Sequence, residues 1–111
     1  MVTIATLNKM LSAFYDDLTL YGYRPTKMIL FGSYAKGNPN TSSDIDIAIW
    51  SPKFSGCISS DIEFLAPIKR NYPLIEIHTF SQEDNEESNP FIEEILHTGK
   101  VFSPQKPLVF L

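Results

Sequence analysis

The sequence predicts an α/β (α+β) domain, built as a small mixed β-sheet with helices mainly on one face, in the order αβαβαβα. Apolar residues recur at helical spacing in three segments and form short strand-like runs in three others. The link between the first two predicted strands, residues 32–44, is short for a parallel crossover. The 111 residues, 43% of them hydrophobic, suffice for one core, so we expect a single domain over 1–111.

A long helix is predicted at residues 4–21. Thr3 is a suitable N-cap, and Gly22 and Pro25 end the helix. Its apolar residues follow three- and four-residue steps and so form one stripe. They are Ile4, Leu7, Leu11, Phe14 and Leu18.

Two strands and a helical turn are predicted next. Residues 27–31 form a short apolar run that suits a buried strand. Residues 33–36 read as a helical turn, which the glycine, asparagine and proline residues of 37–40 break. Residues 44–50 begin with alternating charged and apolar residues and are predicted to form the second strand, which ends at Ser51 and Pro52.

The second half alternates helix, strand and helix. Residues 59–70 predict a helix, in which Pro67 should cause a kink or an early end. Residues 74–80 predict the third strand. A last helix begins at Pro90 and ends at Gly99. We expect the tail to be an extended segment that packs on the core or on a partner.

Charge and composition limit the classes of function. A net charge of −4 argues against stable nonspecific binding to nucleic acid. No apolar run has the length of a membrane span, and the N-terminus shows no secretory signal. Cys57 is the only cysteine, which favours a reducing cytoplasm, and we expect it to be partly buried. The acidic run at 83–87 is interpreted as a solvated loop.

Four residues carry a pattern typical of nucleotide chemistry. Gly32 lets backbone approach a phosphate, and Ser33 offers a hydroxyl and a backbone N–H at the start of a helical turn. Asp44 and Asp46 alternate with isoleucine, so in a strand both carboxylates point to one face. Paired carboxylates can share the divalent metals that drive phosphoryl and nucleotidyl transfer.

This pattern resembles the DNA polymerase β-like nucleotidyltransferase superfamily in its minimal, single-domain (MNT) form. The resemblance implies a third acid on a later strand, and Glu76 fits it. It implies two Mg²⁺ ions held by Asp44, Asp46 and Glu76, with the two aspartates bridging them. Gly32 and Ser33 would hold the β- and γ-phosphates of a triphosphate.

The sequence differs from the usual family pattern at two positions. Lys36 would supply positive charge to the triphosphate where related sequences often carry arginine. Glu76 stands where aspartate is commoner. His78 shares the face of Glu76 and either lines the cleft or is a hydrogen-bonded structural histidine, the interpretation we favour. Trp50 either walls the pocket or packs in the core, and packing is favoured.

The resemblance also implies a partner. Stand-alone MNT proteins often pair with a small helical HEPN protein as the antitoxin of a toxin–antitoxin pair, and some transfer AMP from ATP to a tyrosine of that partner. We therefore expect Mg²⁺ as cofactor, ATP as substrate and a HEPN-type protein as acceptor. Two alternatives stay open: a catalytically inactive partner-binding antitoxin module, and nucleotidylation of a small molecule such as an antibiotic.

Overall fold

The computed structural model describes residues 2–109 and contains every helix and strand expected from the sequence, with ends shifted by at most one residue. Among these residues no helix is long and apolar enough to cross a bilayer. The elements in chain order are α1 (Ile4–Leu20), β1 (Lys27–Phe31), α2 (Gly32–Lys36), β2 (Ile45–Trp50), α3 (Ile58–Lys69), β3 (Ile75–Phe80), α4 (Pro90–Thr98) and β4 (Lys100–Val101).

The strands form one mixed sheet in the order β3-β2-β1-β4. β1 pairs antiparallel with β2 and with β4, whereas β2 and β3 run parallel. The expected mixed sheet is thus confirmed, and the crossover that carries the parallel pair is the long segment containing α3. The two-residue strand β4 was not predicted, and it extends the sheet beyond β1.

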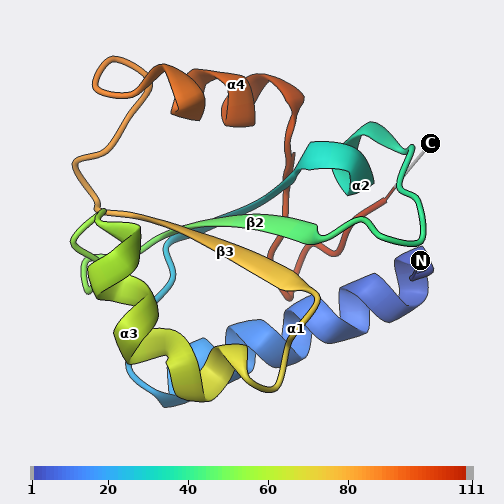
Figure 1. The fold of residues 1–111 in the computed structure, drawn as a ribbon, viewed down its shortest axis with the longest axis horizontal. Coiled ribbons are helices and arrows are strands. Elements are labelled where there is room, and N and C mark those ends of the chain that lie inside the picture. Colours follow the sequence, from blue (N-terminus) through green and yellow to red (C-terminus); the bar gives the residue numbers. More distant parts are fainter. Residues whose placement is uncertain (1, 110–111) are drawn as a thin grey trace.

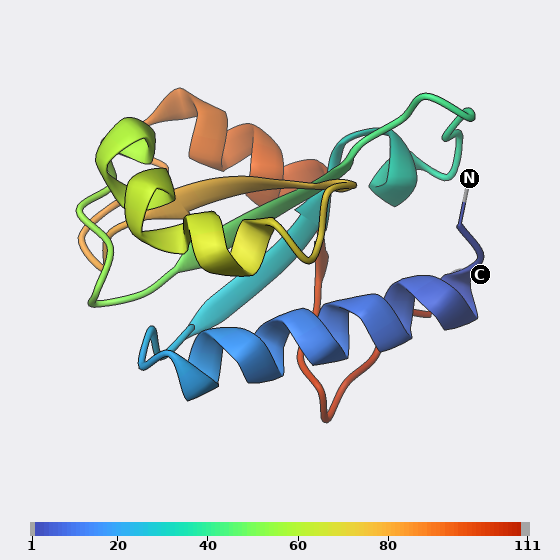
Figure 2. The ribbon, with the colours of Figure 1, turned by 60° about the horizontal axis from the view of Figure 1, so that its bottom comes forward.

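Helices cover both faces of the sheet, with the two longest on the same face (Figures 1 and 2). α1 and α3 pack on one face, because the sheet presents residues such as Leu30, Ile47 and Ile77 to the apolar stripe of α1. α4 packs on the other face, where Ile92 and Ile95 meet a smaller cluster. The sheet residues of that cluster are Ile29, Phe31, Ala48, Trp50 and Phe80.

α1 begins at its predicted cap and holds the C-terminal segment. The Thr3 hydroxyl accepts a hydrogen bond from the backbone N–H of Thr6 at 3.2 Å. Asn8 forms two hydrogen bonds with the backbone of Leu108: its amide donates to the carbonyl at 3.1 Å, and its oxygen accepts from the N–H at 2.8 Å. The buried side chain of Leu108 therefore lies against the core, as expected for a packed tail.

Pro67 does not end α3 early, which was one of the two effects expected of it, the other being a kink. The helix continues to Lys69, and the backbone N–H of Arg70 still bonds to the carbonyl of Ala66. Pro67 lies in the last turn and is exposed, so only one intrahelical bond is lost. Burial of Leu65 and Ile68 on either side of it holds this turn against the core.

The loop at residues 51–57 is tied to the fold by Asp61. This buried carboxylate accepts hydrogen bonds from Ser55, from the backbone of Gly56 and from the hydroxyl of Thr79 at 2.7 Å. Burial acts to raise the pKa of Asp61, but these hydrogen bonds outweigh it and the pKa lies below its usual 3.8.

Cys57 is exposed, so the expectation of a partly buried cysteine was wrong. It lies just before α3, and its sulfur contacts the hydroxyls of Ser59 and Ser60. The hydrogen bond with Ser59, with smaller contributions from Ser60, lowers the pKa of the Cys57 thiol to about 7.

Candidate active site

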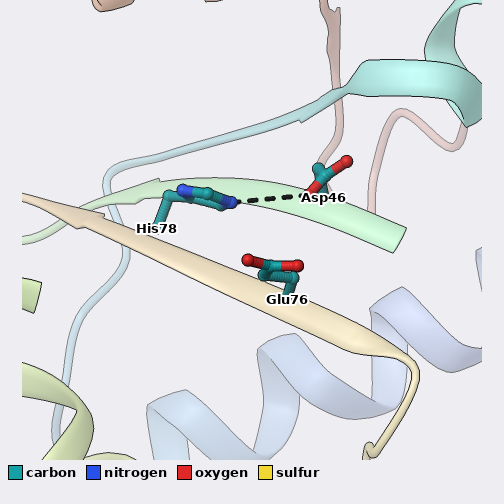
Figure 3. A group of neighbouring side chains, drawn as sticks. All are labelled: Asp46, Glu76 and His78. Atoms are coloured by element: carbon teal, nitrogen blue, oxygen red, sulfur yellow. Dashed lines mark ion pairs between the residues drawn. The ribbon is translucent and has the colours of Figure 1, made fainter. Parts of the chain in front are cut away.

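The sheet brings Asp46, Glu76 and His78 together on the face that carries α4. Asp46 on β2 is directly opposite Glu76 on the parallel strand β3, and His78 is two residues further along β3. Period-2 alternation places all three side chains on one face, where Figure 3 shows them projecting toward one another. Each residue offers a ligand atom, and these atoms lie within 4.8 Å of one another.

His78 is directed at Asp46. Its Nε2 atom lies 3.4 Å from a carboxylate oxygen of Asp46 (Figure 3). That nitrogen is buried and has no hydrogen-bond partner in the part of the chain that the structure describes. The two atoms are close, but their alignment does not make a hydrogen bond. The nitrogen therefore faces the Asp46 carboxylate at ion-pair distance but makes no hydrogen bond with the described residues.

Gly32 is in direct contact with Asp46. It has a φ of +74°, which disfavours any residue with a side chain. A Cβ atom built there would also overlap a carboxylate oxygen of Asp46. Since Phe31, which precedes Gly32, pairs with Asp46 across the sheet, the β1–α2 turn and the acid form one structural unit. The glycine of the predicted motif is required for two independent physical reasons.

The other predicted phosphate-binding residues follow Gly32 in α2. Ser33 is half-buried in the first turn, which no side chain caps. Its hydroxyl and backbone N–H thus lie next to the turn that contacts Asp46. Lys36 is exposed in the last turn.

Asp44 is not part of the group. β2 begins at Ile45, so Asp44 lies outside the strand and is exposed. It lines a cavity of about 350 Å³ that Glu76 and Lys69 also line. The sequence placed the start of the strand at Asp44, whereas β2 begins one residue later, so strand alternation does not fix the orientation of Asp44. In the observed cluster the third position is occupied by His78.

Aromatic rings hold His78 in place. Its ring makes edge contacts with Phe31 at 4.9 Å and with Phe91 of α4 at 6.0 Å between centroids. Phe91 and His78 also line a second cavity of about 320 Å³, which shares Glu76 with the first. Sequence reasoning placed His78 on the correct face but assigned it a hydrogen-bonded structural role, which the described residues do not show.

Two further sequence interpretations concern the far end of this face. Trp50 is buried, stacks on Phe80 at 4.8 Å and donates to the carbonyl of Asp84 at 3.0 Å, so the core interpretation is confirmed. The acidic run at 83–87 is exposed except at Asp84, whose carboxylate accepts from the N–H of Ser81 at 2.8 Å.

Comparisons with known proteins agree with this geometry. A search of curated proteins gave no significant match. Among solved structures, a candidate nucleotidyltransferase from Sulfolobus solfataricus superposes with a TM-score of 0.67 at 15% identity, covering 97% of this chain and 90% of that one. At that identity the likeness shows the fold alone. The sequence model described as polymerase beta, nucleotidyltransferase matches residues 19–107, which include the glycine turn and both acids of the cluster. The chain therefore belongs to the polymerase β family of nucleotidyltransferases.

Proposed function

We propose that this chain is a Mg²⁺-dependent enzyme that transfers AMP from ATP to a hydroxyl group on a partner protein. The observation that carries the proposal is the contact between the Gly32 turn and Asp46, with Glu76 directly opposite Asp46. This arrangement brings the Gly32 turn and the paired carboxylates together at one end of the sheet, which supports a role for the turn in binding phosphate. The family membership supplies the reaction class.

The residues present suit a divalent cation. Asp46 and Glu76 are neighbours across two parallel strands, and like charges placed opposite each other repel. A cation between them removes that repulsion, and carboxylate oxygens are the ligands that Mg²⁺ prefers. Asp46 and Glu76 would hold the metal, and Asp44 would contribute from the edge of the neighbouring cavity. Bound metal ions would supply the positive charge that stabilises the phosphoryl oxygens.

The chain's own groups have distinct tasks in the proposed reaction. The acceptor oxygen forms a bond to the α-phosphorus, the bond from that phosphorus to the bridging oxygen breaks, and pyrophosphate leaves. Glu76 is exposed and takes up the proton of the acceptor hydroxyl. Gly32 gives the triphosphate access to backbone N–H groups, Ser33 donates its hydroxyl to a terminal phosphate, and Lys36 adds positive charge.

The position of Glu76 favours an acceptor carried by a macromolecule. β3 is an edge strand of the sheet, and Glu76 is exposed on it between the two cavities. A hydroxyl on a protruding tyrosine side chain can reach this carboxylate without entering a deep pocket. This accessibility supports the proposed HEPN-type partner, whose tyrosine would be the acceptor.

The test is incubation of the purified chain with α-labelled ATP, Mg²⁺ and the protein encoded by the neighbouring gene. We expect label on the partner, and we expect Asp46→Asn to reduce labelling by at least about a hundredfold, since it removes a metal-binding carboxylate. Glu63→Gln is the matched control, because Glu63 is an exposed acid on α3 and outside the cluster. Equal labelling by wild type and Asp46→Asn would refute the proposal.

One observation favours a second candidate, partner binding without catalysis. Several large apolar side chains are exposed, among them Leu20 at 81% and Phe64 at 70%. Exposed apolar side chains mark a protein interface where they gather into one contiguous patch. Unchanged partner affinity after neutralisation of Asp44, Asp46 and Glu76, together with no ATP consumption by the wild type, would establish this candidate instead.

A further inference from the structure

We propose that His78 is a metal ligand, and that Asp46, Glu76 and His78 form a mixed oxygen–nitrogen site that prefers Mn²⁺ to Mg²⁺. The inference rests on the proposed function, because it concerns the metal of the same site. It adds a residue that the acidic motif does not contain and gives the site a different metal preference. Three observations carry it: the spacing of the donor atoms, the state of the His78 nitrogen and the chemistry of the donors.

The spacing suits one ion. Metal–ligand bonds of about 2.1 Å place two ligand atoms of one ion roughly 3 to 4 Å apart. The three donor atoms lie within 4.8 Å of one another, and His78 Nε2 is 3.4 Å from Asp46. Asp46 is half-buried and Glu76 is exposed, so both carboxylates have room to rotate toward one ion.

The state of the histidine indicates a missing ligand. Buried polar nitrogens in folded proteins almost always have a hydrogen-bond partner. Nε2 of His78 is buried, has no such partner among residues 2–109, and faces the Asp46 carboxylate at 3.4 Å. The ring cannot easily turn away, since Phe31 and Phe91 pack against it. A cation bound to the carboxylates would give this nitrogen its partner.

The donor chemistry sets the preference. Mg²⁺ binds oxygen ligands and holds its waters, and it gains little from an imidazole. Mn²⁺ accepts carboxylate oxygen readily, and imidazole suits first-row transition metals, with affinity rising further along the series to Co²⁺. Two carboxylates and one imidazole therefore favour Mn²⁺ or Co²⁺ over Mg²⁺. Mg²⁺ still fits the carboxylates, so it supports the reaction through weaker binding.

The test measures metal binding, not activity. The full chain is freed of metal with a chelator, and Mn²⁺ and Mg²⁺ are titrated separately by calorimetry, with free Mn²⁺ followed by electron paramagnetic resonance. Both titrations are repeated with a non-hydrolysable ATP analogue. We expect wild type to bind Mn²⁺ about tenfold more tightly than Mg²⁺, or better.

Two variants and a control isolate the nitrogen. His78→Phe keeps a ring for Phe31 and Phe91 to contact, and His78→Ala removes it. Both should weaken Mn²⁺ binding by about tenfold or more and change Mg²⁺ binding by less than about threefold. His97→Ala, at the exposed second histidine on α4, should change neither.

The outcomes separate this inference from the proposed function. Equal losses of Mn²⁺ and Mg²⁺ affinity in His78→Phe, no loss at all, or no preference for Mn²⁺ in wild type overturns the inference. Partner labelling that still depends on Asp46 would then leave the proposed function intact. Circular dichroism of each variant distinguishes loss of the ligand from loss of the fold.

Discussion

At the scale of single residues, the contact between Gly32 and Asp46 connects backbone conformation to chemistry. Gly32 has a positive φ and no space for a side chain. Gly37, which ends α2, has a φ of +78°, and a Cβ atom added there would meet nothing within 4 Å. The two glycines therefore share a conformational requirement and differ in their surroundings. Comparing alanine substitutions at the two glycines therefore separates the effect of backbone strain from the effect of displacing the Asp46 carboxylate.

Gly32→Ala should strongly reduce transfer as well as lower stability. Gly37→Ala should cost about 1 kcal/mol of unfolding free energy, from its positive φ alone, and keep transfer near the wild-type rate. Gly32→Ala carries the same cost and also displaces the Asp46 carboxylate, so we expect transfer to fall by at least about a hundredfold. Urea unfolding and partner labelling measure the two effects. Wild-type transfer by Gly32→Ala would contradict the role of this contact.

The site shows which residue-level features a sequence can supply. Alternation along residues 75–80 correctly puts Glu76 and His78 on one face. It does not show which way the His78 ring turns, because that depends on Phe31 and Phe91, which come from other elements. The start of β2 was predicted one residue early, at Asp44, for a related reason: pairing with neighbouring strands sets where a strand begins, and sequence pattern locates it only approximately.

At the scale of elements, local signals predicted most of the fold and long-range pairing accounts for the rest. Caps, apolar spacing and turn residues located the helices and the strands β1, β2 and β3. β4 has only two residues and exists because Val101 and Lys100 pair with β1, far away in the chain. The packing of α4 over the acidic face also depends on contacts with β1 and α2 that no local pattern reveals.

The clamp between Asn8 and Leu108 fixes the C-terminal segment to α1. Asn8→Ala removes both hydrogen bonds and leaves two backbone groups of Leu108 without them, so unfolding free energy should fall by about 1 to 3 kcal/mol. Hydrogen exchange should show faster exchange at the Leu108 amide. Lys9→Ala, at the exposed neighbouring position, is the control. Unchanged hydrogen exchange at Leu108 in Asn8→Ala would show that these two hydrogen bonds do not hold the C-terminal segment on α1.

At the scale of the whole molecule, Asp61 joins three parts of the fold. It lies on α3 and accepts hydrogen bonds from the loop that follows β2 and from the hydroxyl of Thr79 on β3. The parallel strands that carry Asp46 and Glu76 are linked through this same segment. Its ionisation should therefore affect the stability of the entire domain and not only the local loop.

The acid stability of the protein should depend on Asp61. Its pKa is lowered in the folded chain relative to about 3.9 in the unfolded chain, so its stabilisation is present above about pH 4 and is lost as pH falls through the folded pKa. Asp61→Asn should lower unfolding free energy by about 1 to 3 kcal/mol at pH 7 and flatten its decline in acid. Urea unfolding between pH 7 and pH 3 measures this, with Glu63→Gln as control. Parallel curves for wild type and Asp61→Asn would disprove it.

The register between β2 and β3 makes the enzyme unequally tolerant of changes in chain length. Extra residues at 81–89 would lengthen an exposed connection and leave the acids facing each other. One extra residue between 75 and 76 would turn the rest of the strand over, so that His78 would face α1 and Ile77 would take its place beside the proposed metal site. Natural relatives that keep the chemistry should therefore differ in the loops while preserving the length of this strand.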